Sequence, residues 1–381
     1  MKHASEFRDG ALARKIASAI AAECHADQNY TFMEFCGGHT HTIARYGLEG
    51  MLPQNVRLVH GPGCPVCVLP IGRIDSAIEL ARDHGVTLCT YGDMMRVPGS
   101  HRLSLLKAKA EGADVRMVWS TLDAVKIAEA NPDHQVAFLA IGFETTTPPT
   151  AMALKLAKAK GLKNFSVFCN HVLTPAAMRA ILDGQSLPLQ GIIGPGHVSA
   201  VIGIEPYQEF ADRGKAIVVA GFEPLDLLQA ILMLVRQVNE QAPRVENAYV
   251  RALPAVGNIK AQEVIAKTMT LRGDFEWRGL GRLKDSALRI ADAYEEFDAE
   301  KRFALPYRAV ADPKSCACAE VVRGLKRPEE CKLFGKVCTP DSPIGSCMVS
   351  SEGSCAAHWL YGRHRAPEIR NAPSTPRSKV A

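Results

Sequence analysis

The sequence predicts an α/β protein: two doubly wound, mostly parallel-sheet domains, then a loop-rich region with some helices. Between about residues 30 and 243, short apolar runs alternate with helical patterns, which is typical of βαβ units and a parallel sheet. One such helical pattern lies at 74–82, where apolar residues recur three and four positions apart. After Pro243 the alternation stops, and a third region begins.

Eight apolar runs are predicted strands, which suffices for two doubly wound halves. They are 31–35, 56–59, 86–91, 115–119, 135–141, 165–169, 191–193 and 216–220. Two phrases recur where predicted strands end: Gly61-Pro-Gly63 with Gly194-Pro-Gly196, and Gly142-Phe-Glu144 with Gly221-Phe-Glu223. They indicate a diverged internal duplication, although glycine-rich strand ends are also ordinary turns in α/β proteins.

These patterns divide the chain into five predicted segments. They are an N-terminal helical segment at 1–29 that packs with the C-terminal region, a first α/β domain at 30–132, a second at 133–243, a cysteine-rich C-terminal region at 244–360, and a disordered basic tail at 361–381. The boundary near residue 132 rests on Asn131-Pro132, because the residue before a proline is disfavoured in a helix.

Charge and hydropathy exclude several classes of protein. The 381-residue chain has a formal net charge of +5, of which +4 lies in 361–381, so the folded body is nearly neutral. A nucleic-acid surface would need a basic stripe with interleaved aromatic residues, and the sequence has none. The first 22 residues carry charges throughout, which argues against a signal peptide, and no run approaches the roughly 20 apolar residues of a membrane span. We expect a cytoplasmic protein without a membrane or nucleic-acid partner.

Twelve cysteines in such a chain indicate metal or redox chemistry, because cytosolic thiols are seldom structural disulfides. Cys36 follows a predicted strand and precedes Gly37-Gly38 and a predicted helix, with His39 and His41 one turn away. A helix N-terminus favours a thiolate, and thiolate with imidazole suits a transition metal such as iron. The alternative is a small buried cysteine beside two surface histidines.

Cys64-Pro-Val-Cys67 is a C-x-x-C motif directly after a predicted strand. Two thiols at this spacing can close a reversible disulfide, and the surrounding glycine and proline residues would hold the turn rigid. The same spacing serves as half of a zinc site, but no second C-x-x-C exists to complete it. The sequence therefore favours a redox pair.

Four cysteines in the C-terminal loops are candidate ligands of one metal centre: Cys318, Cys331, Cys338 and Cys355. A loop-rich segment buries little apolar surface, so it needs a cross-link such as a metal centre to stabilise its fold. Four thiolates suit tetrahedral zinc and a cubane iron-sulfur cluster alike. The predicted redox pair at Cys64 and Cys67 would need an electron source, which favours the cluster over zinc. Cys316 and Cys347 are surplus cysteines that leave the choice of ligands open.

Two further polar residues stand at predicted strand ends. They are Glu144 and His197, and Glu144 is a candidate acid or base near the same cleft. The alternative is that Thr145 or Thr146 simply caps the following helix. Cys24, Cys89 and Cys169 fall in helical or strand patterns and are predicted core residues. No phosphate-binding glycine motif is present, and Glu276-Trp-Arg-Gly-Leu-Gly281 is an unusual phrase to which no function could be attached.

Taken in order, five phrases resemble the HypD family of [NiFe]-hydrogenase maturation factors. They are Cys36-Gly-Gly-His-Thr-His41, Gly61-Pro-Gly-Cys-Pro-Val-Cys67, Gly142-Phe-Glu-Thr-Thr146, Gly194-Pro-Gly-His197 and Met348-Val-Ser-Ser-Glu-Gly353. The resemblance runs from about Tyr30 to Trp359. Each phrase is weak alone, but their joint order is highly specific.

The resemblance implies a scaffold that assembles an iron centre carrying two cyanides and one carbon monoxide, together with a HypC-type small chaperone and a HypE-type cyanide donor. It implies that Cys36 holds the iron beside His39 and that Cys64 and Cys67 form the redox pair. A [4Fe-4S] cluster would be held by the four C-terminal candidates named above. Such a protein is a redox-active assembly factor for a metal centre, similar to a transferase or an oxidoreductase, whether it turns over catalytically or is loaded stoichiometrically. Its rivals are a stand-alone iron-sulfur disulfide reductase and a zinc-stapled binding protein.

Overall fold

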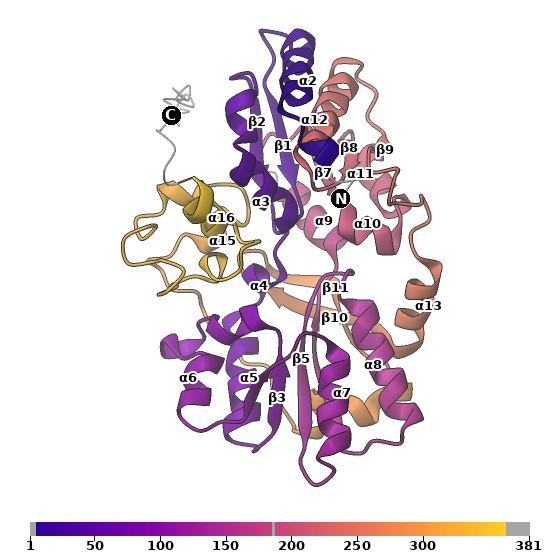
Figure 1. The fold of residues 1–381 in the computed structure, drawn as a ribbon, viewed down its shortest axis with the longest axis vertical. Helices are drawn as coiled ribbons and strands as arrows, with labels where there is room; N and C mark the ends of the chain where they lie inside the picture. Colours follow the sequence, from indigo (N-terminus) through magenta and orange to yellow (C-terminus); the bar gives the residue numbers. More distant parts are fainter. Residues whose placement is uncertain (1–4, 185–186, 363–381) are drawn as a thin grey trace, which may run out of the picture.

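The computed structural model describes residues 5–184 and 187–362, and two parallel sheets form its framework (Figure 1). The first sheet has the strand order β2-β1-β7-β8-β9: β2 (Val56–His60), β1 (Tyr30–Glu34), β7 (Gly191–Pro195), β8 (Ala216–Ala220) and β9 (Val245–Asn247). The second has the order β4-β3-β5-β6: β4 (Val115–Met117), β3 (Thr87–Thr90), β5 (Val136–Gly142) and β6 (Phe165–His171). All these pairings are parallel, as the fold class predicted from the sequence requires.

Helices cover both faces of each sheet. The longer ones are α2 (Gly10–Glu23), α3 (Gly37–Tyr46), α5 (Ile71–Arg82), α6 (Leu105–Ala110), α7 (Thr121–Ala130), α8 (Thr147–Ala159), α9 (Thr174–Asp183), α10 (Gly196–Ile202), α12 (Pro224–Asn239), α13 (Ile259–Thr268) and α16 (Ser354–Tyr361). The shorter ones are α4 (Pro65–Val68), α11 (Gln208–Asp212), α14 (Ala299–Arg302) and α15 (Cys318–Val321). None of the described helices is both long and apolar enough to cross a bilayer.

Alternate strand residues supply the two faces of each sheet. In the first sheet, Phe32 and Val218 pack under α3 and α12, whereas Ile217 and Val219 pack toward α11 on the opposite face. Because side chains alternate along a strand, both layers can be apolar only in a strand that is buried throughout. This is the doubly wound arrangement, and the eight strands expected from the sequence are all present within about two residues of their predicted ends.

The chain visits the sheets in an order that the sequence did not reveal. It forms β1 and β2 in the first sheet, crosses to build the whole second sheet, and returns for β7 to β9. The division expected at residues 132 and 133 falls instead between α7 and β5, inside the second sheet. Hydrophobic periodicity reports that a segment is a strand but not which strand it pairs with, so a discontinuous domain is invisible to it. The internal duplication stays a prediction.

The N-terminal segment packs mainly on the first sheet's layer rather than on the C-terminal region as expected. Helix α2 lies along α12, Arg236 pairs with Glu23, and Tyr30 donates to Asn239 Oδ1 at 2.6 Å. The apolar stripe of α2 completes the core above β1 and β8. One contact does reach the expected region, where the Arg251 guanidinium lies 3.7 Å from the Phe7 ring centroid.

The segment at 244–360 is not one unit. Its first part adds β9 to the first sheet, and α13 packs on α8. A long antiparallel hairpin follows, β10 (Met269–Trp277) and β11 (Gly281–Ile290), which lies against β6 and α9. The cysteine-rich part, drawn in yellow in Figure 1, sits beside α3 and α4. The basic tail expected at 361–381 lies outside the described residues from 363 onward.

Candidate functional site

Cys36 lies where β1 ends and α3 begins. It is the residue before the first turn of α3, in extended conformation, and its side chain is almost fully buried. The double glycine after it allows close packing, because a Cβ on Gly37 would lie 2.3 Å from Glu352 Cβ and one on Gly38 would lie 2.8 Å from the Phe222 ring. The glycine pair thus brings a distant carboxylate and an aromatic ring to the turn that carries Cys36.

The environment of Cys36 favours the neutral thiol, not the thiolate expected from its place at a helix N-terminus. Burial raises the pKa of the Cys36 thiol well above its usual range, and the carboxylates of Glu352 and Glu34 raise it further. The amide N–H groups of Gly38 and His39 act in the opposite direction but are outweighed. A metal cation at this sulfur would displace the proton, because metal ligands must be deprotonated.

His39 is completely buried and forms an aromatic stack with the candidate His197. The Phe222 ring lies between the two imidazoles, 5.0 Å from that of His39 and 3.7 Å from that of His197, centroid to centroid. The carbonyl of Ala220 accepts a hydrogen bond from His39 Nε2 at 3.2 Å, whereas Nδ1 is buried and has no hydrogen-bond partner among the described residues. Burial lowers the pKa of His39, so the ring is neutral with Nδ1 as a free acceptor.

Cys64 and Cys67 are joined by a disulfide at the start of α4, with their Cα atoms 5.2 Å apart. Both side chains are nearly fully buried. The disulfide turn touches the Cys36 turn, because Gly37 N donates to Gly63 O at 3.0 Å. A Cβ on Gly63 would lie 2.4 Å from the Cys36 nitrogen, so the two turns meet backbone to backbone.

Six cysteines line a single small apolar cavity in the C-terminal region. They are Cys316, Cys318, Cys331, Cys338, Cys347 and Cys355, accompanied by Val321, Phe334 and Met348. Gly345 permits this convergence, because a Cβ there would lie 2.6 Å from Cys316 Sγ. The cavity contains all four ligands predicted from the sequence together with both surplus cysteines.

The sulfur donors around this cavity can be compared with the needs of a single metal ion and of an iron-sulfur cluster. Among residues 5–184 and 187–362, no three His, Cys, Asp or Glu side chains are placed to hold a single metal ion. A cubane cluster makes a different demand, because each of its thiolate ligands binds a different iron and the sulfurs need not converge on one point. Sulfur donors spread around an apolar cavity have the chemistry that such a cluster requires.

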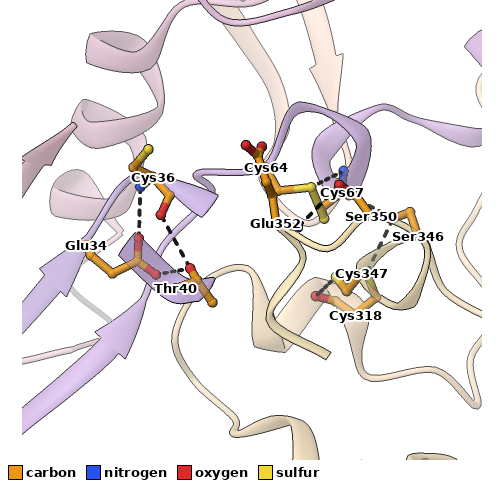
Figure 2. The surroundings of a disulfide bond; sticks show 10 residues. All are labelled: Glu34, Cys36, Thr40, Cys64, Cys67, Cys318, Ser346, Cys347, Ser350 and Glu352. Carbon is orange, nitrogen blue, oxygen red and sulfur yellow. Dashed lines mark hydrogen bonds between the residues drawn. A yellow bond between two sulfur atoms is a disulfide. The ribbon is translucent and has the colours of Figure 1, made fainter. Parts of the chain in front are cut away.

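The disulfide lies between Cys36 and the cysteine cavity (Figure 2). On the cavity side, the hydroxyl of Ser346 donates to the carbonyl of Cys67 at 3.0 Å, and its oxygen is 3.6 Å from Cys318 Sγ. Three groups of sulfur atoms from distant parts of the chain thus follow one another through direct contacts. The predicted site residues at Cys36, Cys64, Cys67 and Cys318 are brought together.

Glu144 is not part of this arrangement. Its carboxylate accepts hydrogen bonds from Thr174 N at 2.9 Å and Thr174 Oγ1 at 2.8 Å, so it caps the first turn of α9. Within the described chain, no hydrogen bond joins it to Cys36, His39 or the disulfide. Burial raises the pKa of Glu144 to about 7, which is a property of its place in the core.

A buried chain of acids and histidines, which the sequence did not indicate, supports the Cys36 turn. Glu34 accepts from the Cys36 amide at 2.8 Å and pairs with His60 Nδ1 at 2.8 Å. His60 Nε2 faces His358 Nε2 at 3.0 Å, so one of these nitrogens carries the proton that both share. The other ring nitrogen of His358 pairs with Glu329. This series of hydrogen bonds connects β2 to α16, the helix that carries Cys355.

Weak signals for the residues that were missed were present in the sequence. Glu352 lies in the phrase at 348–353, Phe222 lies in the repeated Gly-Phe-Glu phrase, and His60 directly precedes Gly61. Glu34 and His358 had no such marker. A glutamate inside a buried strand and a histidine on a short helix acquire a role only when the fold brings them together.

Comparisons with known proteins point to one family. A family model described as "Hydrogenase formation hypA family" and named HypD matches residues 11–362. The chain is 61% identical over 372 residues to hydrogenase maturation factor HypD of Rhizobium leguminosarum bv. viciae, covering 96% of this chain and 97% of that protein. It is 61% identical to the HypD of Azotobacter vinelandii (96% and 98% covered) and 48% identical to that of Escherichia coli strain K12 (88% and 90% covered).

Proposed function

Since the chain belongs to the HypD family of hydrogenase maturation factors, we propose that it assembles the Fe(CN)2CO centre of [NiFe]-hydrogenase as a scaffold and redox factor. The observation that carries this proposal is the contact sequence from the cysteine cavity through the Cys64–Cys67 disulfide to Cys36. A metal-holding thiol, a two-electron couple and a candidate cluster site lie in succession. Each is what stepwise ligand attachment to iron would require.

Cys36 would bind the iron that is being assembled, which is the substrate. Thiolate sulfur is a good donor to low-spin iron, and the surrounding Phe222 and Glu352 limit the access of water. His39 Nδ1 is the buried acceptor that lacks a partner in the described chain. A proton that leaves the Cys36 thiol would pass to this nitrogen or to a nearby carboxylate.

The Cys64–Cys67 pair would exchange electrons with the iron centre. Opening the disulfide takes two electrons and two protons and gives two thiols, and the reverse step returns them. A [4Fe-4S] cluster supplies or accepts one electron at a time. Two successive electrons would therefore cross the Ser346 contact for each disulfide that opens.

The residues that would hold this cluster are Cys318, Cys331, Cys338 and Cys355, with Cys316 and Cys347 lining the same cavity. The apolar lining would exclude water from the sulfurs. Reduced cysteines need a reducing compartment, so we propose that the protein works in the cytoplasm. We further propose a HypC-type chaperone and a HypE-type cyanide donor as partners, because iron must be delivered to and taken from a nearly buried thiol.

Infrared spectroscopy with an iron assay on anaerobically purified protein, with and without its small partner, tests the proposal. The wild type with the partner should show bands of metal-bound cyanide and carbonyl, and Cys36→Ala should lose them and the associated iron. Cys24→Ala is the matched control, because Cys24 lies at the end of α2, away from the site. Bands retained in Cys36→Ala would refute the iron role of Cys36.

A stand-alone iron-sulfur disulfide reductase is the second candidate, favoured by the same contact between the disulfide and the cysteine cavity. Such a protein would need no partner and would bind no cyanide. If the wild type contained the cluster but showed no metal-cyanide bands with its partner present, the reductase would be preferred.

A further inference from the structure

The phrase Glu276-Trp-Arg-Gly-Leu-Gly281 forms the turn between β10 and β11. This turn contacts both the helix of the disulfide and the helix that begins at Cys318. Arg278 N donates to Val68 O at 2.8 Å, immediately after Cys67. On the other side, a Cβ on Gly279 would lie 2.8 Å from Val322 and 3.0 Å from Ala319. Gly279 also has a φ of +80°, which favours glycine. The turn is therefore fitted against α15, which begins at Cys318.

The Arg278 side chain is buried without enough partners. Only 3% of it is exposed, and its single ion pair among residues 5–184 and 187–362 joins Nε to Asp312 Oδ1 at 3.1 Å. Neither Nε nor Nη2 has a well-aligned hydrogen bond in the described chain. Removing a guanidinium from water is costly unless its N–H groups find acceptors. The position of Arg278 therefore calls for a further buried acceptor.

We propose that Arg278 is a positioning residue whose free N–H groups donate to sulfur atoms of the iron-sulfur cluster, raising the reduction potential of that cluster. The inference rests on the proposed function, because it needs a cluster beside Cys318. Arg278 lines a second, larger cavity that shares Cys316, Cys318 and Gly345 with the cysteine cavity, so its side chain lies next to the predicted cluster site. The role of the phrase at 276–281 is then to place Arg278 beside the cluster.

The sign of the effect follows from charge. Reduction adds one negative charge to the cluster, and a nearby cation with hydrogen bonds to sulfur stabilises the reduced form more than the oxidised form. Asp312 opposes this effect, because its carboxylate is paired with the same guanidinium. Arg278 and Asp312 therefore set the potential in opposite directions.

A dissolved anion is the competing partner for Arg278. This second cavity has a volume of about 570 Å³, and His101 and Arg102 also line it, so it has cationic walls. Solvent does not reach Arg278 Nε or Nη2, however, which favours a resident acceptor over one that diffuses in. Phosphate should then leave the potential of the wild-type cluster unchanged.

The test is a redox titration of the cluster, followed by electron paramagnetic resonance, in the full chain. Arg278→Gln should lower the ratio of reduced to oxidised cluster at a fixed potential about tenfold, which is about 59 mV for one electron. Asp312→Asn should raise the ratio, and Arg278→Lys should shift it less than Arg278→Gln. The control is Arg282→Gln on the same hairpin, an exposed arginine paired with Asp274, which should leave the ratio unchanged.

The outcomes separate this inference from the function on which it rests. Normal cluster content with an unchanged potential in both Arg278→Gln and Asp312→Asn would overturn the inference alone. If Arg278→Gln loses its cluster, the other two variants decide. A higher reduction potential in Asp312→Asn together with a slightly lower one in Arg278→Lys supports the inference, and any other combination overturns it. A potential that follows added phosphate in the wild type but not in Arg278→Lys would assign Arg278 to a dissolved anion instead. A wild type without any cluster would overturn both proposals.

Discussion

The hydroxyl of Ser346 donates to the carbonyl oxygen of Cys67 at 3.0 Å while its oxygen lies 3.6 Å from Cys318 Sγ. One small side chain thus touches the helix that carries the disulfide and a cysteine of the apolar cavity. The contact is buried, and Ser346 itself is completely inaccessible to solvent.

Ser346→Ala should weaken this connection without removing any sulfur. Loss of the hydrogen bond to Cys67 should lower the free energy of unfolding by about 1 kcal/mol, the ordinary value for one buried hydrogen bond. Opening of the Cys64–Cys67 disulfide by the reduced cluster should also become slower, measured by trapping new thiols over time. Ser342→Ala, an exposed serine on the same segment, should change neither quantity.

Gly63→Ala should disturb the meeting of the Cys36 and disulfide turns. Its Cβ would lie 2.4 Å from Cys36 N and 2.6 Å from Phe35 C, and backbone atoms cannot move aside cheaply. Overpacking of this kind costs about 1–3 kcal/mol, which denaturant unfolding would measure. Gly273→Ala is the control, because a Cβ there meets no atom within 4 Å, and it should be nearly neutral. Equal effects of the two substitutions would contradict the described contact.

His60→Gln should destabilise the protein more in acid than in base. Burial lowers the pKa of His60, but the hydrogen bond and charge of Glu34 outweigh burial, and the net pKa is raised. The folded state therefore holds the proton more tightly than the unfolded chain, so this stabilisation is complete below about pH 6.5 and disappears as the pH rises through the folded pKa.

The size of the His60 effect follows from its bond to a buried carboxylate. Such a bond contributes about 2 kcal/mol, so the wild type and His60→Gln should differ by about that much at pH 6 and by less at pH 9 in denaturant unfolding. His134→Gln, at an exposed position, serves as the control. A difference that grows with pH would show that the sign is wrong.

Glu144→Gln should increase stability in base. Burial raises the pKa of Glu144 to about 7 from an unfolded value near 4.5, so folding favours the protonated acid. Wild-type stability should then fall as the pH rises from about 4.5 through 7, by an amount on the order of 3 kcal/mol for this shift. Glu144→Gln should remove that fall in thermal unfolding from pH 4.5 to 8.5. A wild type equally stable across this range would exclude the raised pKa.

The fold was largely predictable because its strands are buried on both faces. Each such strand reads as a short apolar run between turn signals, and β1 to β8 were found in this way. The hairpin of β10 and β11 was missed, because its exposed residues, such as Asp274 and Lys284, interrupt the apolar pattern. The return of β7 to pair with β1 depends on contacts across more than 150 residues, and local patterns do not record it.

The site was predictable where chemistry is tied to cysteine and glycine. The spacing of Cys64 and Cys67 predicted a pair able to close a reversible disulfide, and the two cysteines are joined by a disulfide in the structure. The supporting residues Glu34 and His358 were not predictable, because their role depends on tertiary packing. Glu144 was misleading as a candidate acid or base, since the structure uses it as the cap of α9.

In the proposed function, electrons pass from the cysteine cavity to the disulfide beside Cys36. The most direct measurement adds one-electron reductant stepwise to anaerobic protein and counts trapped thiols at Cys64 and Cys67 by mass spectrometry. After the cluster is reduced, each further pair of electrons should yield two new thiols at these positions, and Cys355→Ser protein lacking the cluster should yield none. Thiols that appear equally in Cys355→Ser, or a reduced cluster that leaves the disulfide closed, would contradict the account.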